Sequence, residues 1–121
     1  MPVADTEVLF ALSPRDPKHP HVMDLLRRIK PVYVPDTALL KFVVVLKSRG
    51  VGGRGVIRAL ESLRAILAGL GIREARTIGL DLLVKSTRIM MEQGLTFFDS
   101  LVAASALTVD GTVISDDRAF D

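Results

Sequence analysis

The sequence contains no cysteine and no tryptophan, and it has only two histidines. The absence of cysteine excludes disulfide bonds and thiolate metal sites, and it makes the cytoplasm the expected compartment. Both histidines, His19 and His21, lie in the segment KHPH, which is typical of a turn and the start of a helix. A zinc site is therefore not expected.

Long apolar runs and a basic leader segment are also missing. Uninterrupted runs such as FVVVL, residues 42–46, are far shorter than the roughly 20 residues that cross a bilayer. The first residues carry Asp5 and Glu7 and no basic cluster, so no signal peptide is visible. We expect a protein that does not associate with membranes.

Aliphatic residues dominate what is present. Hydrophobic residues make up 49% of the 121 positions and aromatic residues only 5%, which favours one domain, residues 1–121, with helices packed on a sheet. The formal charge of +2 is mildly basic. It is too weak to identify a nucleic-acid-binding protein, but it is compatible with a phosphate-rich partner.

Positive charge is concentrated between residues 49 and 76. This segment is either a solvated helix face or a surface that follows a nucleic-acid backbone, with Arg54 and Arg58 expected to contact phosphates. Its loop RGVGGRG, residues 49–55, is not a phosphate-binding loop, because no strand precedes it and no Lys-Ser/Thr pair closes it. The segment contains Arg49, Arg54, Arg58, Arg64, Arg73 and Arg76 against Glu61 and Glu74.

Short apolar segments predict three strands, and apolar spacing predicts helices between them. The strands are expected to end at Asp5, to cover VYV at 32–34 and to cover TVIS at 112–115. A helix that Thr6 can cap follows the first strand, and an amphipathic helix begins at Asp16 and Pro17. Strands separated by helices indicate a parallel sheet with helices on its faces, an α/β sandwich.

Three further helices are predicted from caps and apolar stripes. Residues 36–48 form a helix that Asp36 or Thr37 caps, and it is apolar on nearly every side, so we expect it to be buried. The next helix ends near Gly69 or Gly71, and the one after it ends at Gly94, with its methionines as core filler. The two stripes consist of Val56, Leu60, Leu63, Leu67 and Leu70, and of Leu80, Leu83, Val84, Thr87, Met90 and Met91.

Aspartates follow two of the strands, and another opens the helix in TFFDSLVAASAL. Asp5 ends the first strand, Asp116 and Asp117 follow the last, and Asp99 lies in the first helical turn after Thr96. Each alone can have a structural role, such as capping a helix. Three carboxylates that converge raise one another's pKa unless a cation neutralises them, and oxygen-only ligation favours Mg²⁺ or Mn²⁺.

These motifs, taken in order, resemble PIN-domain nucleases, in particular the VapC-type ribonuclease toxins. The matching segments are ADTEVLFAL, PVYVPDTALLKF, GLTFFDSLVAASAL and VISDDRAF, which span essentially the whole chain. The resemblance implies a PIN-like three-layer α/β/α sandwich with a central parallel sheet. It also implies a Mg²⁺- or Mn²⁺-dependent endoribonuclease, a VapB-like antitoxin as partner, and a homodimer.

The resemblance also assigns roles to single residues. Asp5, Asp99 and Asp117 would hold the metal and act in catalysis, and Asp116 is the less favoured ligand. Ser115 matches the Thr/Ser of a Thr/Ser-x-Asp pattern and would orient Asp117, while Thr6 would help to fix Asp5 or the substrate.

Lys41 departs from the family pattern. In that family, the helix after the second strand carries an acidic residue at this position. One interpretation is a polar stripe with Thr37 and Ser48, in which the lysine stem packs and its head reaches water. In the other, the ammonium pairs with Asp5 or Asp99 in place of metal, and the domain binds a partner without cleaving RNA. A receiver-type signalling domain is disfavoured, because ADTEV and ISDDRAF lack its acidic pair and its lysine.

Overall fold

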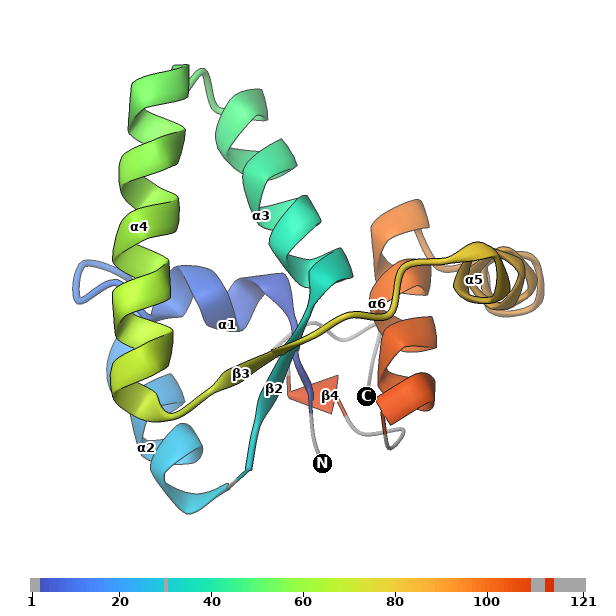
Figure 1. Cartoon of the computed structure of the whole chain (residues 1–121), viewed down its shortest axis with the longest axis horizontal. Helices are drawn as coiled ribbons and strands as arrows, with labels where there is room; N and C mark the ends of the chain where they lie inside the picture. The colour runs from blue at the N-terminus through green and yellow to red at the C-terminus, as the bar shows by residue number, and fades with distance from the viewer. Residues whose placement is uncertain (1–2, 30, 110–112, 115–121) are drawn as a thin grey trace.

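The computed structural model describes residues 3–29, 31–109 and 113–114. Within them, a four-stranded sheet has the order β3-β2-β1-β4, and every pairing is parallel (Figure 1). The strands are β1 (Val3–Ala4), β2 (Tyr33–Pro35), β3 (Arg73–Ala75) and β4 (Val113–Ile114). Helices pack around this sheet, which confirms the expected α/β sandwich.

Six helices connect the described strands. They are α1 (Thr6–Ala11), α2 (His19–Arg28), α3 (Asp36–Ser48), α4 (Gly53–Leu70), α5 (Leu80–Gln93) and α6 (Phe97–Val109). The expected ends of α4 and α5 are confirmed, since Gly71 and Gly94 adopt left-handed φ angles of 71° and 68° just past each helix. Helix α2 begins two residues after its predicted start at Pro17, and the Asp16 carboxylate accepts the Lys18 N–H at 2.8 Å in the turn that precedes the helix.

Strand β3 was not predicted from the sequence. Its three residues, Arg73, Glu74 and Ala75, contain no apolar run, and both charged residues are exposed. The strand lies at the edge of the sheet and pairs with β2 alone among the described strands. An exposed edge strand needs no hydrophobic side chains, so its sequence carries no strand pattern.

Two apolar clusters hold the elements together. The larger cluster joins α1, α2, α3 and α4 to the two central strands, and Val102 of α6 extends it. The smaller one joins α5 to α6 through Leu82, Leu101 and Ala104. No helix among the described residues has the length and apolarity that a membrane crossing requires.

The predicted apolar stripe of α5 does not face the core, which corrects the sequence interpretation. Leu80 and Met91 are 83% and 79% exposed, whereas Leu82 on the opposite side is 2% exposed. The stripe lies outward because α5 packs on α6 with its other face. Helix α3 was likewise expected to be buried throughout, but Leu40 and Val44 are exposed.

Candidate active site

Asp5 lies directly after β1, at the carboxyl edge of the sheet, and is only 1% exposed. Its carboxylate accepts the Glu7 N–H at 2.6 Å and so caps α1. The sequence analysis offered Thr6 as a possible cap of this helix, but the Asp5 carboxylate fills that role. Capping fixes a buried carboxylate at the end of a strand, where parallel α/β sheets place their ligands.

Thr6 instead links α1 to α3. Its side chain is buried, and its Oγ1 donates a hydrogen bond of 3.1 Å to the Ala38 carbonyl. Because Ala38 lies in the first turn of α3, this bond holds Asp5 near the start of that helix. Lys41 follows Ala38 by about one turn.

Asp99 lies in the first turn of α6 and is 8% exposed. Its backbone N–H donates to Thr96 Oγ1 at 3.3 Å, as the capping pattern predicts. Its carboxylate faces Lys41 of α3.

The Lys41 ammonium lies 3.2 Å from Asp99 Oδ1 and forms an ion pair with it. The side chains are 23% and 11% exposed, so most of this pair is shielded from water. Lysine at this position therefore supplies positive charge to a buried carboxylate. Of the two sequence interpretations, pairing with Asp99 is the one that the structure shows.

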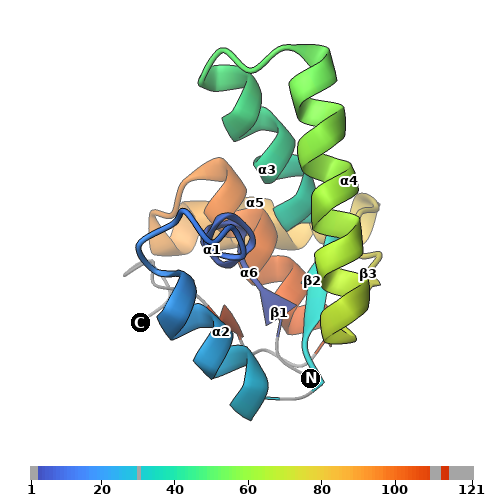
Figure 2. The same cartoon turned by 90° about the vertical axis from the view of Figure 1, so that its left-hand side faces the viewer.

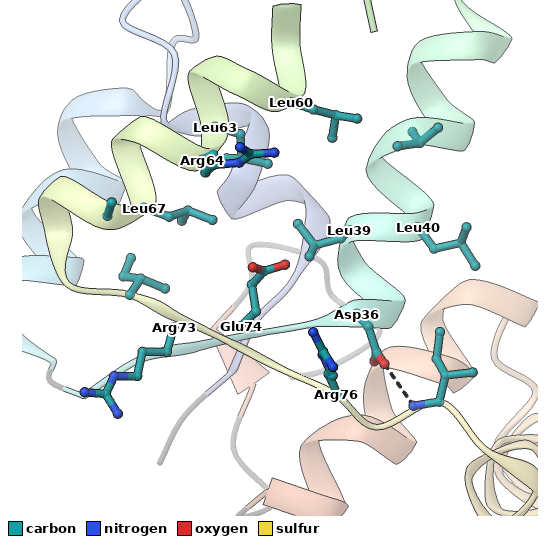
Figure 3. A pocket seen from close by; sticks show the side chains of 14 residues that line it. Asp36, Leu39, Leu40, Leu60, Leu63, Arg64, Leu67, Arg73, Glu74 and Arg76 are labelled. Atoms are coloured by element: carbon teal, nitrogen blue, oxygen red, sulfur yellow. Dashed lines mark hydrogen bonds between the residues drawn. The ribbon is translucent and has the colours of Figure 1, made fainter. Parts of the chain in front are cut away.

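Asp36 is another anchored carboxylate, for which the sequence analysis predicted only a capping role. It accepts bonds from the Thr77 N–H at 2.9 Å, the Thr77 hydroxyl at 2.7 Å and the Ile78 N–H at 3.0 Å (the pair with Ile78 is drawn in Figure 3). It also accepts the Thr37 N–H at 3.0 Å. The carboxylate thus fastens the β3–α5 loop to the start of α3.

A chain of hydroxyl groups continues from this loop into α6. Ser105 Oγ lies 2.7 Å from both Thr37 Oγ1 and Thr77 Oγ1, and it donates to the Leu101 carbonyl at 3.0 Å. Thr37 and Ser105 are fully buried. The network fixes α3 against α6, and these two helices carry Lys41 and Asp99.

The structure shows no contact of the remaining predicted site residues with Lys41 or Asp99 among the residues that it describes. Ser115, Asp116 and Asp117 lie outside the described residues, although Ile114 pairs with Ala4, the residue before Asp5. Arg54 and Arg58 are exposed in the first two turns of α4, at the outer end of the α3–α4 hairpin (Figure 2).

The donor chemistry of the site suits a hard divalent cation only in part. Asp5 and Asp99 offer buried carboxylate oxygens, the ligands that Mg²⁺ and Mn²⁺ prefer. The Lys41 ammonium already occupies one Asp99 oxygen. Within the part of the chain that the structure describes, no three Asp, Glu, His or Cys side chains gather in a metal-like group.

Comparison with known proteins identifies the family. A family model, PIN domain, matches residues 3–121, and the chain belongs to this family. A sequence search among curated proteins finds no match.

Solved structures share the fold at low sequence identity. VapC20 of Mycobacterium tuberculosis, a sarcin–ricin loop cleaving toxin, is 19% identical with a TM-score of 0.73 over 99% of this chain and 92% of its own. A Klebsiella pneumoniae toxin–antitoxin complex is 16% identical with a TM-score of 0.70 over 99% and 90%. A Pyrobaculum aerophilum protein is 19% identical with a TM-score of 0.63 over 98% and 80%.

Proposed function

We propose that this protein is a VapC-type toxin, a metal-dependent endoribonuclease that hydrolyses RNA phosphodiester bonds. The observation that carries the proposal is the pair of buried carboxylates, Asp5 and Asp99, at the first turns of α1 and α6 in a chain of the PIN family. Carboxylates are rarely buried unless they are paired or hydrogen-bonded, and Asp5 lies at the carboxyl edge of the sheet, where parallel α/β sheets place their ligands. The fold shared with a ribonuclease toxin adds support.

In this proposal, Asp5, Asp99 and Asp117 hold Mg²⁺ or Mn²⁺, and Ser115 orients the side chain of Asp117. A bound divalent ion supplies positive charge for the scissile phosphate and lowers the pKa of an attacking water. The chain's own residues supply placement: Thr6 and its bond to Ala38 set the distance between α1 and α3. The hydroxyl network of Ser105 sets the distance between α3 and α6.

The Lys41–Asp99 ion pair favours a second candidate function. An ammonium beside a metal ligand repels Mg²⁺ and takes the place of an acidic side chain. The second candidate is therefore a PIN-like binding domain in which Lys41 replaces the metal charge and cleavage is weak or absent. Calorimetric titration with Mn²⁺ separates the two, because only the nuclease requires a saturable metal site.

The test of the first candidate is Asp99→Asn with single-stranded RNA as substrate. The amide retains the shape of the side chain but lacks the charge that a divalent ion requires, so we expect metal-dependent cleavage to be lost. Asp24→Asn is the matched control, because Asp24 is an exposed acid paired with Arg28 on α2. Undiminished cleavage by a folded Asp99→Asn variant, or cleavage that a chelator leaves unchanged, would contradict the proposal.

A VapB-like antitoxin is the proposed protein partner, and the cytoplasm, where RNA targets are found, is the proposed compartment. The fold shared with a chain from a Klebsiella pneumoniae toxin–antitoxin complex supports the partner. Co-purification with the product of an adjacent reading frame would test it.

A further inference from the structure

Several charged side chains line a surface groove without a partner in the described part of the chain. The groove has a volume of about 830 Å³ and lies between α3, α4 and β3, and we name it the α3–α4 groove (Figure 3). The side chains are those of Arg64 on α4, Arg73 and Glu74 on β3, and Arg76 just after β3. None of them forms a hydrogen bond or an ion pair with another residue that the structure describes.

The floor of the groove presents Glu74 and Arg76 to a ligand. Side chains two positions apart share one face of an extended segment, so these two lie on the same side of β3 and its continuation. Figure 3 shows Glu74 pointing between the two helices, while Arg64 reaches into the same space from α4 and Arg73 points away along the margin. One carboxylate and two guanidinium groups are therefore available inside the groove.

The walls of the groove are apolar. They consist of Leu39, Leu40, Val43, Leu60, Leu63 and Leu67. A small-molecule site of this kind combines apolar walls with a few polar groups that fix the orientation of the ligand. The ligand should offer a flat apolar body, N–H donors for Glu74 and negative charge for the arginines. An unpaired nucleotide of a single-stranded RNA has all three features.

The carboxylates of the groove disfavour an acidic peptide as its occupant. Asp36 and Glu74 both line the groove, so the acidic side chains of such a peptide would approach like charges. A nucleotide avoids this repulsion, because its base edge brings N–H donors to the carboxylate while its phosphates stay at the arginines.

The groove and the candidate active site lie on opposite sides of α3. Lys41 directs its side chain toward α6, where it contacts Asp99, whereas Leu40 and Val43 line the groove. The diameter of one helix, roughly 10 Å, separates the two surfaces. One RNA strand can therefore contact both, with a nucleotide in the groove that is not the one being cleaved.

We propose that the α3–α4 groove is a base-recognition subsite that binds one unpaired guanine of the RNA. Glu74 accepts the N1–H and an N2–H of guanine, which are parallel donors on its Watson–Crick edge, and Arg64 and Arg76 contact neighbouring phosphates. The other bases each place an acceptor beside their donor and so offer Glu74 a poorer match. The choice of RNA rests on the proposed function, but binding in the groove requires no metal ion.

The first experiment compares labelled uridine oligonucleotides by fluorescence anisotropy in EDTA. One has a guanosine at its centre, one has an inosine there, and one has uridine throughout. We expect the wild type to bind the guanosine oligonucleotide about tenfold more tightly than the uridine one. Inosine should lose most of this preference, because it lacks the N2 amino group.

Glu74→Gln tests the base contact. The substitution removes a paired acceptor and also a negative charge, so the preference for guanosine should fall severalfold while the affinity for the uridine oligonucleotide rises. A general loss of folding would lower both affinities instead. Glu61→Gln is the matched control, since Glu61 is an exposed acid on α4 that does not line the groove, and it should keep the preference.

The double variant Arg64→Gln and Arg76→Gln tests the phosphate contacts. It should weaken binding of both oligonucleotides by about tenfold or more and leave their ratio unchanged, because phosphates carry no base identity. The control is the double variant Arg28→Gln and Arg88→Gln, which removes the same charge from exposed positions on α2 and α5 outside the groove. It should bind more tightly than the groove variant.

Three results would overturn the proposal: equal affinity of the wild type for all three oligonucleotides, an unchanged preference in Glu74→Gln, or equal binding by the two arginine double variants. Polyglutamate that displaces the RNA and binds more tightly would also overturn it and assign the groove to an acidic protein segment. Circular dichroism establishes that each variant is folded. A protein that prefers guanosine but does not cleave RNA with Mn²⁺ would contradict the proposed function alone, and cleavage without the preference would contradict this proposal alone.

Discussion

Lys41 sets the electrostatics of the candidate active site at the scale of single residues. Its ammonium lies within 3.2 Å of Asp99, and both side chains are largely shielded from solvent. Removal of one partner from such a pair leaves an uncompensated charge, which costs more than the pair contributes net. Substitutions of Lys41 therefore report on both folding and metal binding.

Lys41→Glu is predicted to replace the Lys41 ammonium with a bound metal ion as the positive charge beside Asp99. Without metal, the new carboxylate repels Asp99 and lowers the free energy of unfolding by about 2–4 kcal/mol. With Mn²⁺ at a hundred times its dissociation constant, about 2.7 kcal/mol should return by mass action. Thermal melting with and without Mn²⁺ measures the two effects, and calorimetry measures the affinity.

Lys41→Met is the matched control for this prediction. It removes the ammonium without adding an oxygen ligand, so it should lose stability without metal but gain less from Mn²⁺ than Lys41→Glu does. If Lys41→Glu binds Mn²⁺ no better than the wild type, position 41 does not face a metal site. The ion pair with Asp99 would then have a structural role alone.

The sequence singled out Asp5 and Asp99 but did not predict their contacts. Asp5 stands out because it follows a strand and Asp99 because it opens a helix after Thr96, and the structure buries both. The sequence left two interpretations of Lys41, because its ion pair joins side chains 58 positions apart. Such a pairing depends on how α3 and α6 pack, which no local pattern contains.

At the scale of elements, Asp36 holds the β3–α5 loop against the start of α3. The carboxylate accepts bonds from Thr37, Thr77 and Ile78, and Thr77 continues into the hydroxyl chain of Ser105. Bonds to a charged acceptor contribute more than neutral ones. The loop and the two helices thus form one connected unit behind the site.

Asp36→Ala should therefore destabilise the protein by about 2–4 kcal/mol, because three backbone N–H groups and one hydroxyl lose their acceptor. Chemical denaturation measures this loss. Asp24→Ala is the control, since it breaks an exposed pair with Arg28 and should cost only about 0–1 kcal/mol. Equal losses for the two variants would show that the Asp36 cluster contributes no more than a surface ion pair.

Helix ends were predictable from the sequence, whereas the burial of helix faces was not. Gly71 and Gly94 end their helices because glycine adopts positive φ without strain, a local property. Apolar spacing shows that α5 has an apolar face, but it does not show whether the rest of the chain covers that face. Leu80 and Met91 therefore resembled core residues and proved to be exposed.

At the scale of the whole molecule, the basic residues lie outside the candidate active site. Arg54 and Arg58 are exposed one turn apart in the first two turns of α4, which lie at the outer end of the α3–α4 hairpin (Figures 1 and 2), while Lys41 and Asp99 form a largely buried pair between α3 and α6. We expect an RNA strand that contacts both the site and this end to run along the hairpin. The arginines would then contact its phosphates rather than the reacting group.

RNA affinity is accordingly predicted to fall with salt, with a slope that depends on these arginines. Each phosphate contact to a single strand contributes about −0.7 to the slope of log K against log salt, so the Arg54→Gln and Arg58→Gln double variant should lower the magnitude of the slope by about 1.4. Fluorescence anisotropy with labelled single-stranded RNA measures this slope. All variants carry Asp99→Asn, which we expect to suppress cleavage during the measurement. Arg28→Gln is the control, because Arg28 pairs with Asp24 on α2. The prediction is contradicted if the double variant, Arg28→Gln and the wild type all give the same slope. The arginines of α4 would then belong to an ordinary solvated surface, and the RNA would have to follow another face of the protein.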